Sequence, residues 1–268
     1  MTELFLAVFF LAVTGAFAGI LAGLLGVGGG IVLVPAFFYL FSAFGYHSDG
    51  LMQVCLATSL ATIIVTSARS VMAHQRRGAV DWEILRAWAL PIAIGAMAGV
   101  LMVAQLRTVT LQIIFGVLLT VIALYMLVSR SEWRLADAMP KGPSVWAMGG
   151  VTGFISVLLG IGGGSIGVPL MTLHGRPIHR AVATAAGFGL LIAAPSVALF
   201  LLTPAEAPPP YTLGSVNLPA FAIVIVMTTL TAPYGAALAH RLDAKRLKRA
   251  FAVFLGLVAL NMLRKALL

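Results

Sequence analysis

Long uncharged stretches recur along the chain, separated by short polar segments. The stretches 4–45 and 111–129 contain no charged residue, and a transmembrane helix needs roughly 20 consecutive apolar residues. No segment alternates polar and apolar positions over about 10 residues, as the strand of a membrane barrel would. The pattern therefore predicts an all-α, polytopic membrane protein that crosses the bilayer several times.

The apolar residues form ten segments, five in each half of the chain. They run roughly over 4–25, 30–44, 51–73, 84–105 and 109–129, and then over 145–160, 164–174, 181–202, 217–239 and 247–266. The second segment of each half is short for a full span, and a glycine-rich break separates it from the first. We therefore expect each half to begin with a glycine-broken helical hairpin, followed by three spanning helices. Whether the hairpin helices span the membrane fully or re-enter on one side stays open.

The two halves also share a sequence motif. Residues 24–35 read LLGVGGGIVLVP, and residues 158–169 read LLGIGGGSIGVP. An Ala-Thr pair follows in each half, at 57–58 and at 183–184. So many glycine matches in one register indicate an internal duplication. The chain is therefore expected to be a single membrane domain of two repeats, and we place their boundary at residues 134 and 135, giving repeats 1–134 and 135–268.

Basic residues mark the orientation of the repeats. If the loops that hold most of the 17 Lys and Arg residues are placed in the cytoplasm, only Arg107, Arg264 and Lys265 fall outside. The basic loop 74–83 corresponds by the repeat to loop 203–216, which holds no Lys or Arg. Equivalent loops thus carry opposite charge bias, which predicts inverted repeats of the kind found in secondary transporters. The Lys and Arg residues that anchor the cytoplasmic loops also account for the net charge of +9. Nucleic acid is therefore not expected as a partner.

The two glycine runs, 26–30 and 160–164, are the leading candidates for a substrate site. Glycine costs a helix about 1 kcal/mol relative to alanine, and non-helical backbone at membrane depth must be buried in protein or line a cavity. If a short helix starts after each run, its free N–H groups form an anion site. The predicted substrate contacts at the runs are Gly28, Gly29, Gly30, Gly162, Gly163, Gly164 and Ser165. The alternative is that these glycines only permit close helix crossing.

Hydroxyl groups within the spans add further candidates, namely Thr58, Ser59 and Thr184. Each could donate a hydrogen bond to an anion, or could instead bond to a carbonyl of its own helix. None of the eight carboxylates lies near the middle of a span, and the five histidines show no metal-ligand spacing. No nucleophile motif is present either. We therefore expect no catalytic residues, no metal site and no cofactor.

The paired glycine motifs, each followed by an Ala-Thr element, resemble the sulfite exporter TauE/SafE family, and the resemblance extends from Gly15 to Met262. It implies a multi-pass permease of the bacterial or archaeal inner membrane that moves sulfite or small organosulfur anions, mostly outward. The motif residues carried over by position are Gly26, Gly28, Gly29, Gly30 and Pro35, with Gly160, Gly162, Gly163, Gly164 and Pro169. The second Ala-Thr element continues with Ala185 where the first has Ser59, so a serine role is not carried over there.

Export agrees with the physics of the membrane, because an anion that leaves a negative interior gains about 2.3 kcal/mol per charge and 100 mV. An exporter therefore needs no intramembrane carboxylate for a coupling ion. The sequence predicts a secondary transporter that binds a small anion near the midplane between the two glycine breaks, and the resemblance implies that this anion is sulfite or a small organosulfur anion. An importer or channel for another small anion and a non-transporting membrane scaffold remain alternatives. The anion, the coupling ion and the oligomeric state are left open.

Overall fold

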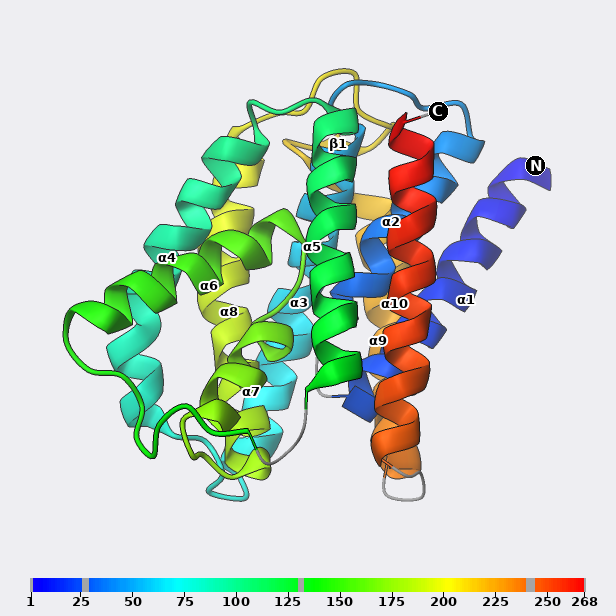
Figure 1. The fold of residues 1–268 in the computed structure, drawn as a ribbon. Coiled ribbons are helices and arrows are strands. Elements are labelled where there is room, and N and C mark those ends of the chain that lie inside the picture. The colour runs from blue at the N-terminus through cyan, green and yellow to red at the C-terminus, as the bar shows by residue number, and fades with distance from the viewer. Residues whose placement is uncertain (1, 26–28, 130–132, 240–243, 268) are drawn as a thin grey trace.

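The computed structural model describes residues 2–25, 29–129, 133–239 and 244–267. These residues form ten helices and one short β-hairpin (Figure 1). Seven of the helices are long and apolar enough to cross a membrane. The prediction of an all-α, polytopic membrane protein is confirmed.

Each half of the chain contributes five helices, and the second helix of each half is its shortest. They are α1 (Thr2–Leu25), α2 (Gly30–Ala43), α3 (Leu51–Gln75), α4 (Trp82–Val103) and α5 (Thr108–Val128), then α6 (Pro143–Leu158), α7 (Gly164–Leu173), α8 (Ile178–Leu202), α9 (Leu218–Ala239) and α10 (Ala244–Leu267). The short helices of the two hairpins are α2 and α7. All ten predicted segments are helices, because continuous apolar runs fix their positions.

The connection between α8 and α9 contains a small hairpin that the apolar pattern does not reveal. Strand β1 (Thr212–Leu213) pairs antiparallel with β2 (Val216–Asn217). Its turn includes Gly214, whose φ of +58° favours glycine. The hairpin leads directly into α9 and positions Asn217 at the start of that helix.

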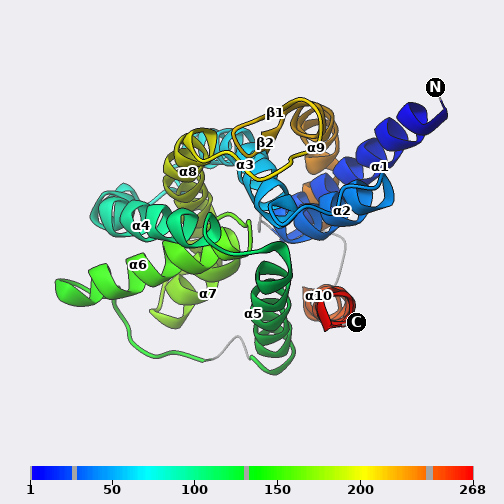
Figure 2. The same ribbon diagram turned by 90° about the horizontal axis from the view of Figure 1, so that it is seen from above.

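Helices α3 and α8 form the centre of the molecule. They pack against each other, and 67% and 56% of their apolar spans are buried, compared with 22% for α1 and for α9. The first helix of each hairpin packs on the opposite half of the chain, since α1 lies along α9 and α6 lies along α4. The short helices α2 and α7 pack mainly on α3 and α8 of their own halves. Helices α5 and α10 pair on the remaining side (Figure 2). This packing pattern is the same for both halves. The α1–α9 contact corresponds to the α6–α4 contact, and the α3–α8 and α5–α10 pairs each join two equivalent helices.

Equivalent helices of the two halves run in opposite directions, as α5 and α10 show most clearly (Figure 1). At one end of the molecule the connections 44–50 and 104–107 meet, where the Thr108 N–H donates to the Asp49 carbonyl at 2.8 Å. The connection after α8 reaches the same end, because Gly50 lies against the backbone of Glu206. We call this the outer end, in line with its scarcity of basic residues. The opposite end, the inner end, carries Arg76, Arg77, Arg134, Lys141 and Arg176.

Candidate functional site

The two glycine breaks meet against α3. A Cβ atom added to Gly30 would collide with the carbonyl oxygen of Gly160 and would lie 3.1 Å from both Ile161 Cα and Ser59 Oγ. The Ser59 hydroxyl donates a hydrogen bond of 2.8 Å to the same Gly160 carbonyl. Gly160 has a φ of +58°, which an L side chain rarely adopts. Gly30, Ser59 and Gly160 thus form a buried junction, which we call the glycine junction.

Other glycines of the two runs pack against neighbouring helices. A Cβ atom on Gly163 would strike Phe188 Cβ and lie 2.9 Å from the Ala185 carbonyl of α8. A Cβ atom on Gly29 would lie 2.8 Å from the Ala18 carbonyl of α1. Close packing therefore requires these glycines whether or not an anion binds. Gly164 is the buried first residue of α7, whereas Gly26 and Gly28 lie outside the described residues.

The short helices direct their N-terminal ends at the glycine junction. From the breaks, α2 runs toward the outer end and α7 toward the inner end (Figure 1). The first N–H groups of a helix have no partner within it, and the helix dipole adds partial positive charge there. The N-cap residues Gly29 and Gly163 have no side chain that could cap these groups. Backbone donors from both halves therefore surround the breaks.

Two hydroxyl groups near the second break have no hydrogen-bond partner among the residues that the structure describes. They belong to Ser156, in the last turn of α6, and Ser165, in the first turn of α7, and both oxygen atoms are buried. A buried polar group without a partner costs about 1–3 kcal/mol. These hydroxyls can therefore donate to a ligand without giving up an existing bond. Sequence reasoning found Ser165 but missed Ser156, which stands where the first half has Ala22.

Gly162 extends this region toward α3 and α8. A Cβ atom there would lie 3.2 Å from Ile63 Cγ2, 3.7 Å from Gly189 Cα and 3.9 Å from Ser67 Oγ. The Ile63 contact is tight and the other two are ordinary, so Gly162 is less crowded than Gly163. A side chain at Gly162 would require Ile63 of α3 to shift by a few tenths of an ångström.

Thr58 binds the start of α9 and does not face a free space. Its side chain is fully buried, and its hydroxyl accepts a hydrogen bond of 2.9 Å from the Asn217 backbone N–H. The Asn217 side chain in turn accepts from the Ala220 N–H at 3.1 Å, which caps α9 in the usual way. We call the Thr58–Asn217 contact the α9 anchor.

Thr184 makes the equivalent contact in the other half. Its fully buried hydroxyl accepts a hydrogen bond of 3.0 Å from the Asp81 backbone N–H. Asp81 caps α4 by accepting from the Ile84 N–H at 3.3 Å. This contact, the α4 anchor, lies at the inner end, whereas the α9 anchor lies at the outer end. The structure therefore does not bring Thr58 and Thr184 together on one ligand, although each retains a hydroxyl hydrogen.

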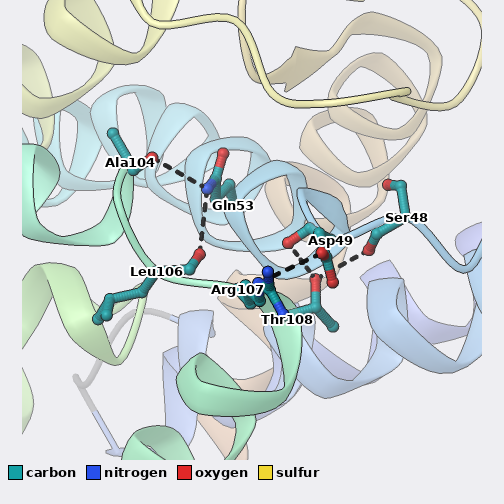
Figure 3. A network of polar contacts seen from close by, with 7 residues as sticks. All are labelled: Ser48, Asp49, Gln53, Ala104, Leu106, Arg107 and Thr108. Atoms are coloured by element: carbon teal, nitrogen blue, oxygen red, sulfur yellow. Dashed lines mark hydrogen bonds and ion pairs between the residues drawn. The ribbon is translucent and has the colours of Figure 1, made fainter.

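Polar contacts reinforce both ends of the molecule. At the inner end Arg176 pairs with Asp81 at 3.6 Å, and the two side chains are 37% and 14% exposed. At the outer end the Gln53 amide donates to the carbonyl oxygen of Val103 at 3.2 Å. Figure 3 shows its bonds to the carbonyl oxygens of Ala104 at 3.4 Å and Leu106 at 3.2 Å. The Gln53 contacts tie α3 to the connection between α4 and α5. Among the described residues, no group of three or more His, Cys, Asp or Glu could hold a metal ion.

The chain is similar to probable membrane transporter proteins along nearly its whole length. The sequence profile of the sulfite exporter TauE/SafE family matches residues 11–262. A probable membrane transporter protein of Haemophilus influenzae is 33% identical over 94% of this chain and 96% of its own length. A probable membrane transporter protein of Methanocaldococcus jannaschii is 28% identical over 94% of each chain. No solved structure matches. On the match over residues 11–262, the chain belongs to the sulfite exporter TauE/SafE family and is a multi-pass membrane transporter.

Proposed function

We propose that this transporter exports sulfite or a small organosulfur anion across the cell inner membrane, and that the anion binds at the glycine junction. The observation that carries the proposal is the meeting of two glycine breaks, each followed by a helix N-terminus, inside the protein. Helix N-termini favour anions through their free N–H groups and their dipole. The Ser156 and Ser165 hydroxyls supply further donors, which match the several acceptor oxygens of a sulfur oxyanion.

Neutral donors suit a substrate that must also be released. A buried arginine would hold an anion more strongly, and a tightly held ground state slows the step that releases it. Basic residues gather instead at the inner end, where the exposed Arg76 and Arg77 raise the local concentration of anions in the cytoplasm. An inside-negative potential then drives the anion outward by about 2.3 kcal/mol per charge and 100 mV.

Transport requires that the buried junction open to one side at a time. We propose that the repeats 1–134 and 135–268 are inverted halves that alternate in this way. The α9 anchor would separate when the outer end opens, and the α4 anchor when the inner end opens. Each anchor links a central helix to the start of a helix of the opposite half, so it crosses between the halves that must move.

A flux assay tests the substrate and the direction. The protein is reconstituted in liposomes, and the fluxes of sulfite, thiosulfate, sulfoacetate and sulfate are measured with an inside-negative potential. We expect saturable outward flux of sulfite or an organosulfur anion. Large single-channel currents in bilayer recordings would instead identify a channel. The absence of flux for every anion would contradict a transport role for these substrates.

Matched serine variants test the location of the site. Ser165→Ala removes a donor to a charged ligand, so anion binding is expected to weaken about 10- to 100-fold, since such a bond contributes about 1.5–3 kcal/mol. The control is Ser196→Ala, because the Ser196 hydroxyl is equally buried but donates to the Ile192 carbonyl of its own helix at 2.7 Å. Equal anion affinity in both variants would place the anion elsewhere.

A further inference from the structure

An apolar groove lies between α1 and α2 at the outer end of the molecule. The N-terminal part of α1 diverges from the helices beside it (Figures 1 and 2). The groove has a volume of about 650 Å³ and is lined by residues from α1 and from the end of α2, among them Leu6, Phe9, Phe10, Tyr39, Leu40 and Ala43. It lies at the opposite end of α2 from Gly30, so it is separate from the glycine junction.

Two cations from the last turn of α10 stand beside this groove. The Lys265 ammonium lies 5.0 Å from the centre of the Tyr39 ring and 5.4 Å from that of Phe38. Arg264 is close enough for its charge to act on the Tyr39 hydroxyl. Neither cation forms a salt bridge with any carboxylate of the described segments. Together with Arg107, they are the basic residues that the charge pattern leaves on the outer side.

The Tyr39 hydroxyl joins the two features. Its oxygen is buried and lies beside the Asn261 side chain of α10, but the contact falls short of good hydrogen-bond geometry. A tyrosine placed between apolar surface and a polar boundary usually makes a well-formed hydrogen bond. The groove therefore combines an apolar floor, a hydroxyl without a well-formed hydrogen bond, and two cations that form no salt bridge within the described segments.

We propose that this groove binds one anionic phospholipid, with an acyl chain along α1 and α2 and the phosphate beside Lys265, Arg264 and the Tyr39 hydroxyl. The floor suits an acyl chain because it is apolar and carries exposed aromatic side chains such as Phe9. Its volume lies within the range of about 300–1,000 Å³ typical of small-molecule sites. Charge complementarity selects an anionic headgroup, since positive side chains at the membrane surface attract anionic lipids. A zwitterionic lipid brings no net charge to match the two cations.

Lipid retention measured by native mass spectrometry tests the proposal. The purified full chain in detergent is titrated with phosphatidylglycerol or with phosphatidylcholine carrying the same acyl chains. One phosphatidylglycerol is expected to bind with a clear preference over phosphatidylcholine. In the double variant Arg264→Gln and Lys265→Gln, its affinity should fall about 30-fold, because each cation near an anionic surface contributes a factor of about five. Tyr39→Phe should weaken binding further without affecting the preference for charge.

A matched double variant controls for the general effect of lost charge. Arg76→Gln with Arg77→Gln removes two exposed cations from the inner end and should leave the high-affinity phosphatidylglycerol site unchanged. Equal affinity for the two lipids, or an unchanged affinity in the variant at residues 264 and 265, would overturn the proposal. A dimer that forms through the groove without lipid, and that Ala43→Trp disrupts, would show that a second copy of the chain occupies it instead.

Discussion

Replacing Gly30 by alanine adds one methyl group at the point where the two glycine breaks touch. The new Cβ would collide with the Gly160 carbonyl and crowd Ser59 Oγ at 3.1 Å. Ordinary contact begins at 3.4 Å, so the backbone at Gly160 would have to retreat by roughly an ångström. Gly160 cannot easily do so, because Ser59 holds its carbonyl at 2.8 Å. Overpacking of this kind costs about 1–3 kcal/mol.

Gly256→Ala is the matched control, because a Cβ atom added there meets open space. In the middle of α10 this change should stabilise the protein by about 0.4–1 kcal/mol through the unfolded state. The midpoint of thermal unfolding in detergent should therefore be about 3–10 °C lower for Gly30→Ala than for Gly256→Ala. Flux should be lost in the first variant and kept in the second. Equal stability and equal flux in the two variants would show that the breaks do not touch as described.

Two further predictions concern the orientation of the repeats and the anchors. With Cys55→Ala as background, Arg77→Cys and Tyr211→Cys should react with an impermeant thiol reagent from opposite sides of the membrane, and labelling of both from one side would refute the inverted arrangement. Thr184→Val leaves the partly buried Asp81 N–H without its acceptor, so the free energy of unfolding should fall by about 1 kcal/mol; an unchanged denaturation midpoint would mean that the α4 anchor contributes nothing.

The helices could be predicted from the sequence because a bilayer imposes a simple requirement on length and polarity. The residues of α5, for example, contain no charge and no proline, and their limits follow from the polar residues at each side. The break before α2 could be predicted for a similar reason, since three successive glycines disfavour a continuous helix. Such properties belong to each segment separately and do not depend on the rest of the fold.

The partners of individual side chains could not be predicted in this way. Thr58 and Thr184 were recognised as a repeated pair, but their bonds to Asn217 and Asp81 depend on helices far away in sequence. Ser156 was missed because a single serine in an apolar helix most often bonds to its own backbone. Its unpaired hydroxyl becomes visible only when the packing of α6 is known.

The crossed packing of the hairpin helices has a consequence for synthesis at the ribosome. Helix α6 lies along α4, which is already made when α6 emerges, whereas α1 lies along α9, which begins only at Leu218. At about 5–20 residues per second, the roughly 190 intervening residues take about 10–40 s to translate. During this interval α1 remains inserted without its main protein partner, and lipid covers the face that α9 later occupies. Completion of the fold therefore waits for the last fifth of the chain, and nascent chains that stop before α9 expose a ready target for membrane quality control.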